Sequence, residues 1–426
     1  ERFNIDDRLR ELGIPGVSVA VVIDGKLEWA KGYGMADSSE NRAIDANTLF
    51  LAGSISKPVA AIRAHQLHEQ GIMDLDTDIN TYLKSRKLPD NEFTEEEKVT
   101  VRRILNHTAG LTVWGFPGYD KGDTIPTVPE VLDGKGNTDS VRVYKQPGES
   151  WQYSGGGYTI MQLAITDTEG ESFPQIMESN VLRPMGMEVS TFSNPLPEQM
   201  HSIAATGYRR GGSEVEGKWP IYPEMAAAGL WTTPSELIQY AVEIQKVLLS
   251  KEDGILKSQT VEEMLTPGMN NHGLGPTVSE FTFGHNGADE GFRAGLVAWK
   301  DKADAIVVMV NSDNGSIMTE ILLAIAEEYQ LKGIEPDVKK VVELDSDKLM
   351  NYAGSYEMEE YGQTTITIEN GGLACDGGWF SYPAFLLPEN DTTFFNVSSG
   401  TIYNFQFEED QVTGFIVREL AAEKLD

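Results

Sequence analysis

The sequence predicts an α/β region that ends near residue 332 and is followed by a small all-β module. Through the first 332 residues, apolar runs of strand length alternate with runs of helical periodicity. The composition then changes, and a charged segment leads into short runs in which apolar and polar residues alternate. A chain of 426 residues with 40% hydrophobic residues is long enough for two or three domains and apolar enough to form a core.

The N-terminal region opens with a β-hairpin signal. In GVSVAVVIDGKLEWAKGYGMAD, residues 16–37, two strand-like runs are joined by Asp24-Gly25, a pair typical of tight hairpin turns. We expect a helix that carries Ser54 within FLAGSISKPVAAIRAHQLHEQG (50–71) and another over VTVRRILNHTAGL that closes at Gly110. Residues 112–150 are rich in Gly, Pro and Asp with little periodicity, which predicts loops that border a site.

The rest of this region continues the alternation. We expect a helix over PSELIQYAVEIQKVLL (234–249), strands over FRAGLVAWK (292–300) and DAIVVMVNS (304–312), and a last helix that ends at Gly333.

The C-terminal segment has the pattern of a separate domain. Residues 333–346 form a charged linker, and residues 347–426 carry the period-two runs TTITIEN, TTFFNV, IYNFQFEED and VTGFIVREL. Gly and Asn turns separate these runs, so we expect a small β-barrel or sandwich over 347–426.

The net charge of −32 makes binding to nucleic acid improbable, because such a surface repels phosphate backbones. The longest apolar runs are far shorter than the roughly 20 residues of a membrane span, so no membrane span is expected.

With a single cysteine, Cys375, the chain cannot form an internal disulfide. The chain begins at Glu1 without a methionine, so both a periplasmic or secreted protein after leader removal and a cytoplasmic protein stay open.

The stretch SISK places Ser54 and Lys57 three residues apart where a helix begins, so both side chains project from the same face. Pro58 suits a first helical turn, where its missing N–H leaves no bond unmade. The positive end of the helix, together with burial, disfavours an ammonium group. A neutral amine at position 57 is a base that can activate the hydroxyl at position 54.

Two further stretches carry chemistry. In PGESWQYSGGGYTIMQLAI, Tyr153 precedes three glycines and a helix, and a tyrosine held there can relay protons between Lys57 and Ser54. In FTFGHNGADEGFRAGLVAW, a strand runs into His285-Asn286-Gly287, where the glycine marks a close approach of ligand or backbone.

Together, these three elements resemble the serine β-lactamase and penicillin-binding protein superfamily, in particular its class C-like branch. SISK matches the S-x-x-K box, YSG stands where that branch has Y-x-N, and HNG stands where β-lactamases have K-T-G. ILNHTAGL and GIMDLDTDINTYL also resemble segments of the branch. The resemblance covers residues 1 to about 332 and implies an antiparallel sheet flanked by helices. Several members also carry a C-terminal β-barrel, so the tail is expected to be a lipocalin-like barrel.

The resemblance implies a role for each matched residue. Ser54 would be the acylated nucleophile, Lys57 its base and Tyr153 the proton shuttle to the leaving group. The backbone N–H groups of Ser54 and Ala288 would form the oxyanion hole. His285, Gly287 and Gly155 would line the substrate site.

Two departures from the pattern bear on the substrate. Gly155 replaces an asparagine amide, and His285 replaces a lysine that would bind a carboxylate. Both favour an esterase or related peptidase that acts on small esters, amides or short peptides. A D-amino-acid peptidase or amidase, a weak β-lactamase and a non-catalytic sensor remain alternatives.

We expect neither a cofactor nor a metal site. His65 and His68 lie three residues apart on the helix expected to carry Ser54, but no matched pair of ligands occurs elsewhere. The C-terminal β-module could mediate contacts between copies of the chain, so a homo-oligomer is also an open expectation. The expected partner is a small-molecule ester or peptide substrate.

Overall fold

The computed structural model describes residues 4–358, 362–377, 383–397, 399–417 and 420–425. Its contacts divide the chain into two compact units, one that runs to Ile334 and one that starts at Glu335. Each unit is described by itself. The predicted domain limits of 1–332, 333–346 and 347–426 stay predictions.

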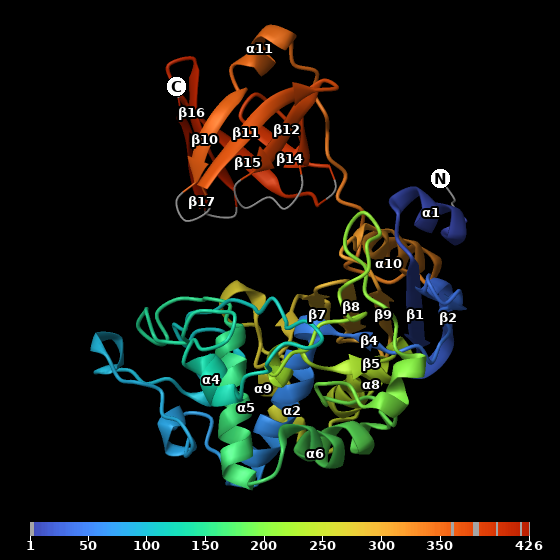
Figure 1. The fold of residues 1–426 in the computed structure, drawn as a ribbon, viewed down its shortest axis with the longest axis vertical. Helices are drawn as coiled ribbons and strands as arrows, with labels where there is room; N and C mark the ends of the chain where they lie inside the picture. The colour runs from blue at the N-terminus through green and yellow to red at the C-terminus, as the bar shows by residue number, and fades with distance from the viewer. Residues whose placement is uncertain (1–3, 359–361, 378–382, 398, 418–419, 426) are drawn as a thin grey trace. The chain divides into compact units, whose positions relative to one another are not determined.

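A seven-stranded sheet with the strand order β3-β2-β1-β9-β8-β7-β6 forms the frame of the first unit (Figure 1). All its neighbouring strands are antiparallel. The strands are β1 (Gly16–Ile23), β2 (Lys26–Asp37), β3 (Arg42–Ala43), β6 (Thr277–Val278), β7 (Thr282–Asp289), β8 (Phe292–Trp299) and β9 (Ala305–Val310). A separate two-stranded ladder pairs β4 (Phe50–Leu51) with β5 (Trp231–Thr232). The predicted hairpin over 16–37 is confirmed, with Asp24 and Gly25 at φ of 50° and 74°.

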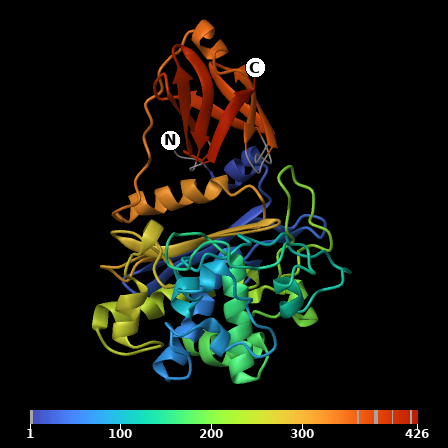
Figure 2. The same ribbon diagram turned by 90° about the vertical axis from the view of Figure 1, so that its left-hand side faces the viewer.

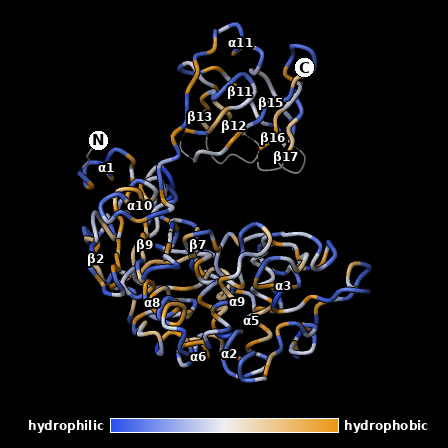
Figure 3. The backbone as a smooth tube through the Cα atoms, turned by 180° about the vertical axis from the view of Figure 1, so that it is seen from behind, coloured by the Kyte–Doolittle hydropathy of each residue, from blue (hydrophilic) through white to orange (hydrophobic). Residues whose placement is uncertain are grey.

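Helices cover both faces of this sheet, as the edge-on view in Figure 2 shows. One face carries α1 (Ile5–Leu12) and α10 (Ser316–Glu328), and the other carries α8 (Pro234–Ser250). The side chains of β1 alternate between the two cores: Val17, Val19 and Val21 join the cluster beneath α1 and α10, whereas Ala20 and Val22 join the main core. Strands buried on both faces read as unbroken apolar runs, which Figure 3 shows along β9. The predicted helix-flanked antiparallel sheet is therefore confirmed.

The remaining helices form the body of the unit on the side of α8. They are α2 (Ser56–Glu69), α3 (Val101–Leu105), α4 (Val128–Leu132), α5 (Gly155–Glu169), α6 (Phe173–Met177), α7 (Met225–Ala228) and α9 (Ser258–Met264). None of the helices in the described part of the chain has the length and apolar character needed to cross a bilayer.

Two predicted helices end earlier than the sequence suggested. The helix expected to close at Gly110 ends at Leu105, because the side chain of Asn106 accepts a hydrogen bond from the Thr108 N–H and His107 takes a left-handed φ of 60°. The helix expected to end at Gly333 stops at Glu328 and is followed by Gln330 at φ 55°.

The second unit is a closed barrel in which eight strands follow one another in sequence order. Its last strand pairs with its first, so the barrel has no free edge. The strands are β10 (Gly354–Met358), β11 (Gly362–Glu369), β12 (Gly372–Gly377), β13 (Ala384–Pro388), β14 (Thr393–Asn396), β15 (Ile402–Glu408), β16 (Gln411–Val417) and β17 (Leu420–Leu425), preceded by α11 (Ser346–Met350). The predicted all-β barrel is confirmed. Residues 418 and 419, within the predicted run VTGFIVREL, lie outside the described residues.

Aromatic side chains fill the barrel interior. Phe415 is fully buried and its ring lies 5.2–5.8 Å from those of Tyr356, Tyr403 and Phe405, measured between centroids. Cys375 is also buried, and this burial raises the pKa of its thiol to about 12. A thiol of this kind is inert rather than reactive.

Replacing Phe415 with alanine should lower the free energy of unfolding of the barrel by about 3–5 kcal/mol, because the substitution opens a cavity in a filled interior. Hydrogen exchange measured by mass spectrometry on the full chain should show faster exchange in β10–β17. The control Ile368→Ala, at a side chain that is 41% exposed, should change exchange little. Equal exchange in F415A and the unsubstituted protein would show that this ring does not stabilise the barrel.

Candidate active site

The turn that carries Ser54 joins β4 to α2. Residues Gly53–Ile55 form a 3₁₀ turn that leads directly into α2, so Ser54 precedes this helix instead of lying on it as predicted, and Gly53 has a left-handed φ of 53°. Of the described residues 51–65, all except Ser54 are buried. The fold therefore presents one hydroxyl from an otherwise inaccessible segment. Ser56, two residues on, is buried, and its Oγ accepts a hydrogen bond from the Leu230 N–H.

Lys57 lies in the first turn of α2, and its side chain is enclosed by protein. The residue is 2% exposed, and its Nζ lies 3.0 Å from the Ser54 Oγ and 2.8 Å from the Ala227 carbonyl oxygen in α7. Nζ also lies 4.9 Å from the centre of the Tyr153 ring. The structure thus brings together the three residues that the sequence placed in the catalytic group.

The ring of Tyr153 is held among other aromatic and imidazole rings. It stacks on His107, with 4.2 Å between centroids and 29° between planes, and lies 6.2 Å from His285. His107 accepts a hydrogen bond at Nδ1 from the Ser154 N–H at 3.1 Å, so its proton is on Nε2. Burial holds the pKa of His107 well below its usual value, with a further contribution from His272. These contacts fix the orientation of Tyr153 without adding charge.

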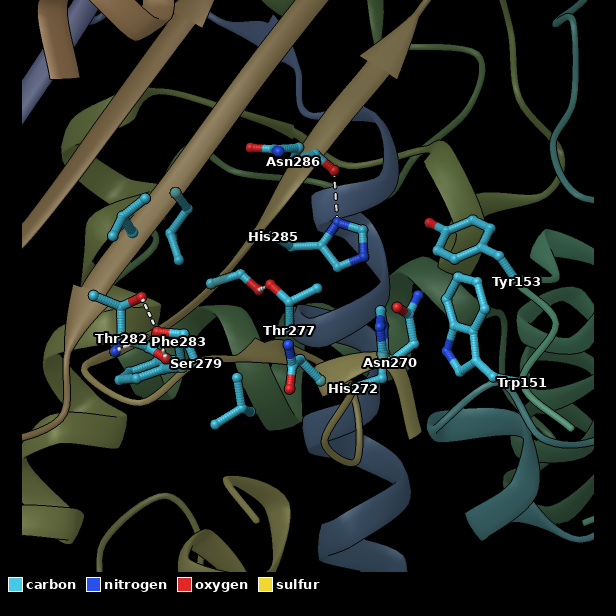
Figure 4. Close-up of a pocket in the computed structure, with 15 residues that line it drawn as sticks. Trp151, Tyr153, Asn270, His272, Thr277, Ser279, Thr282, Phe283, His285 and Asn286 are labelled. Carbon is cyan, nitrogen blue, oxygen red and sulfur yellow. Dashed lines mark hydrogen bonds between the residues drawn. The ribbon is translucent and has the colours of Figure 1, made fainter. Parts of the chain in front are cut away.

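His285 approaches Tyr153 from β7 (Figure 4). Its Nδ1 lies 2.5 Å from the Asn286 carbonyl oxygen, and since a carbonyl only accepts, Nδ1 carries the proton. Burial lowers the pKa of His285 to about 3. Burial likewise lowers the pKa of the neighbouring His272 to about 4. Position 285 therefore offers the site a neutral imidazole at physiological pH.

The turn of Ser54 and strand β7 approach so closely that neither backbone tolerates a side chain. A Cβ at Gly287 would lie 1.9 Å from the Ala52 carbonyl oxygen, and a Cβ at Gly53 would lie 2.5 Å from the Ala288 nitrogen. This approach puts the backbones of Ser54 and Ala288 on adjoining segments, where the sequence placed the oxyanion hole. His285 and Gly287 both lie inside β7 rather than after a strand.

Gly155 begins α5 and is buried. A Cβ on it would lie 3.0 Å from the Phe116 ring and 3.1 Å from the Trp114 carbonyl oxygen, so a larger side chain has no free space there. A direct contact between Gly155 and a substrate stays a prediction.

A pocket of about 410 Å³ adjoins Tyr153 and His285. Trp151 and Tyr153 enter it from one side and His285 from the other, and His272 and Asn270 lie between them (Figure 4). None of the described residues that line it is Lys, Arg, Asp or Glu. The pocket thus gives no ionic partner to a charged ligand.

Two buried carboxyl groups near the site were not predicted. Burial raises the pKa of Asp289 to about 8, and its carboxyl accepts a hydrogen bond from the Gly53 N–H. Burial also raises the pKa of Glu224, at the start of α7, to about 8. Within the described residues, Asp289 Oδ2 and both carboxyl oxygens of Glu224 have no hydrogen-bond partner.

Sequence reasoning also missed His107, His272 and Trp114. His107 lies inside the ILNHTAGL stretch that resembles the family, but the resemblance was not used to give this histidine a role. In the described parts of the chain, no group of three His, Cys, Asp or Glu side chains is arranged to hold a metal ion.

Comparisons with known proteins show which family the chain belongs to. The Beta-lactamase family profile matches residues 3–330, and a profile described as a domain of unknown function (DUF3471) matches residues 338–426. The chain belongs to the Beta-lactamase family, which is the superfamily of penicillin-binding proteins and serine β-lactamases predicted from its motifs.

Individual relatives are distant. Penicillin-binding protein 4* of Bacillus subtilis (strain 168) is 24% identical, and the alignment covers 94% of this chain and 92% of that protein. The octameric penicillin-binding protein homologue from Pyrococcus abyssi matches the fold with a TM-score of 0.66 at 22% identity, over 99% of this chain and 98% of that one. SurE, solved with D-Leu, matches with a TM-score of 0.63 at 22% identity, over 98% and 97% of the two chains.

Gly287→Ala should lower the free energy of unfolding by about 1–3 kcal/mol, because the added methyl group collides with backbone rather than with a movable side chain. Denaturant unfolding followed by tryptophan fluorescence measures the change. Gly115→Ala is the matched control, since a Cβ there meets nothing within 4 Å. If the two variants are equally stable, the close approach of β7 to the Ser54 turn does not exist in solution.

Glu224→Gln should flatten the pH dependence of stability. Between its ordinary pKa of 4.5 and the raised value of about 8, the folded protein keeps a proton that the unfolded chain has lost, so stability falls as pH rises through this window. Gln stays neutral, so the fall should be shallower by up to about 1.4 kcal/mol per pH unit. Urea unfolding from pH 5 to 8 measures it, with the exposed Glu96→Gln as control. Parallel curves for the unsubstituted protein and E224Q would refute the burial of this carboxyl.

Proposed function

We propose that the protein is a cofactor-free serine hydrolase that forms an acyl-enzyme on Ser54 and hydrolyses small esters, amides or short peptides. The observation that carries the proposal is the 3.0 Å contact between Lys57 Nζ and the Oγ of Ser54, a partly exposed residue within a segment that is otherwise buried. A base within hydrogen-bonding reach of a hydroxyl is the arrangement that nucleophilic catalysis requires.

In the acylation step, neutral Lys57 takes the proton of Ser54 while Oγ attacks the carbonyl carbon of the substrate. A neutral amine has two N–H bonds and one lone pair. One N–H can donate to the Ala227 carbonyl at 2.8 Å while the lone pair faces the Ser54 hydroxyl. The proton then passes through Tyr153 to the leaving group as the bond to it breaks. The products of this step are the acylated serine and a neutral alcohol or amine.

The negative charge that develops on the carbonyl oxygen would be stabilised by the backbone N–H groups of Ser54 and Ala288. Each hydrogen-bond donor fixed in this way typically increases the reaction rate by about 10²–10³-fold. In deacylation, a water molecule gives up a proton to the same Tyr153–Lys57 pair and attacks the acyl carbon. Ser54 leaves with a proton, and the acid is released.

The uncharged surroundings favour substrates without a carboxylate next to the reacting bond. His285 is neutral, and the described residues that line the pocket carry no charge, so a β-lactam or C-terminal carboxylate would find no cation there. This supports the ester and amide assignment over an efficient β-lactamase, although weak β-lactamase activity through the same residues stays an alternative.

A D-amino-acid peptidase or amidase that works through the same residues is the second candidate. The match to SurE, which was solved with D-Leu, motivates it. Assays of D- and L-amino acid p-nitroanilides beside p-nitrophenyl esters distinguish the two. Marked preference for the D-anilide with negligible ester turnover would replace the esterase assignment.

Ser54→Ala should abolish both the covalent adduct with a fluorophosphonate and the burst of p-nitrophenol from p-nitrophenyl acetate, because no nucleophile remains. Intact-mass measurement and stopped-flow absorbance detect these two signals. Ser258→Ala, at the first residue of α9, is the control and should retain both. If the unsubstituted protein forms no adduct under any condition, the non-catalytic sensor replaces the hydrolase. Full turnover by S54A would reject Ser54 as the nucleophile.

We also propose self-association, supported by the octameric state named for the Pyrococcus abyssi homologue. Sedimentation velocity of the full chain tests it, and a single species of 46.9 kDa at all concentrations would exclude it.

A further inference from the structure

The indole of Trp114 is the most exposed large apolar side chain of the first unit within the described residues. It is 68% exposed, whereas Trp231 and Trp299 in the same unit are buried. Leaving an indole in water forgoes a large apolar contribution to stability, so an exposed tryptophan beside a catalytic group calls for an explanation.

Trp114 lies directly beside the catalytic tyrosine. Its ring centroid is 5.6 Å from that of Tyr153, and the ring of Trp151 lies 6.3 Å from Tyr153. The three rings form what we call the aromatic wall (Trp114, Trp151 and Tyr153). Trp151 and Tyr153 also line the pocket next to His285, so the aromatic wall connects this pocket to solvent-exposed Trp114.

The loop that carries Trp114 is held in place rather than free. The carbonyl oxygens of Trp114 and Val113 accept hydrogen bonds from the N–H groups of Gly155 and Gly156, each at 3.0 Å. Val113 adopts a left-handed φ of 64°, an unfavourable conformation for a β-branched residue. A conformation of this cost persists where the surroundings impose it, and such positions concentrate at functional sites.

The pocket next to the aromatic wall offers no charged side chain among the described residues that line it. The first three residues of α5, Gly155–Gly157, have no side chain to reach a ligand. The neighbouring pocket is lined in part by the apolar residues Val278, Phe283 and Leu296, and its imidazole at 285 is neutral. Selectivity at this place therefore does not come from ion pairing with the pocket, and the exposed indole of Trp114 adds apolar contact beside neutral polar groups such as the Asn270 amide.

We propose that Trp114 is a specificity-determining residue, and that the aromatic wall selects uncharged esters that carry an aromatic or bulky apolar group next to the scissile bond. The inference rests on the proposed serine hydrolase function and specifies its substrate class. The apolar group packs on the indole of Trp114, removes it from water and positions the carbonyl carbon against Ser54. A small ester such as methyl acetate is too short to make this contact.

The test compares kcat/KM of the full chain for methyl acetate, benzyl acetate, methyl phenylacetate and benzyl hydrogen succinate, measured by acid release. We expect the unsubstituted protein to prefer at least one of the two aromatic neutral esters over methyl acetate by about tenfold or more. Trp114→Ala should reduce that preference about tenfold, mainly through KM, while methyl acetate changes less than about twofold. Trp114→Phe should restore most of the preference. Benzyl hydrogen succinate, which carries a carboxylate, should be a poor substrate throughout.

Leu27→Ala is the control, because Leu27 is also an exposed apolar side chain, at 49%, but lies on β2. The inference is overturned if W114A lowers kcat/KM for methyl acetate and the aromatic esters equally, if it lowers neither, or if the carboxylate ester is turned over as fast as benzyl acetate. Absence of Ser54-dependent turnover of every ester in the unsubstituted protein is a different result, because it removes the proposed hydrolase function itself.

Discussion

The close approach of two backbone segments governs the arrangement of the site. The turn Gly53–Ile55 and strand β7 meet where a Cβ on either Gly53 or Gly287 would overlap main-chain atoms. This contact fixes the Ser54 hydroxyl relative to the sheet, and it brings the Ala288 backbone beside that of the turn. Because β7 is paired with β8 along its whole length, the sheet holds the proposed nucleophile, Ser54, in a fixed position.

Uncharged, tightly packed surroundings follow from this arrangement. Lys57, His107 and His285 are all less than 10% exposed, and burial lowers the pKa of both imidazoles. Placing neutral rings around Tyr153 fixes the position of its hydroxyl without competing for its proton. The same packing leaves Asp289 and Glu224 as buried acids whose pKa values are raised to about 8. The burial that would pre-organise the proposed proton-transfer group thus also leaves Asp289 Oδ2 and both carboxyl oxygens of Glu224 without a hydrogen-bond partner among the described residues.

Features that depend on residues close together in the sequence could be predicted, whereas features that depend on tertiary packing could not. The Asp24-Gly25 hairpin and the Ser54–Lys57 contact depend on residues within a few positions of each other, and both appear as expected. The stacking of His107 on Tyr153 joins residues 46 positions apart and follows from tertiary packing alone. The helix expected to extend to Gly110 ends before His107, which has a left-handed φ that the sequence did not predict. The sequence also contains no pattern that predicts the burial of an acidic residue such as Glu224.

A crystal structure of the full chain after reaction with an alkyl fluorophosphonate tests the central claim most directly, because the phosphonyl group imitates the tetrahedral intermediate. The account predicts a bond between phosphorus and the Ser54 Oγ, with the phosphoryl oxygen about 2.7–3.1 Å from the backbone nitrogens of both Ser54 and Ala288. The Lys57 Nζ should remain beside Oγ. A phosphonyl group on another residue, or a phosphoryl oxygen directed away from β7, would contradict it.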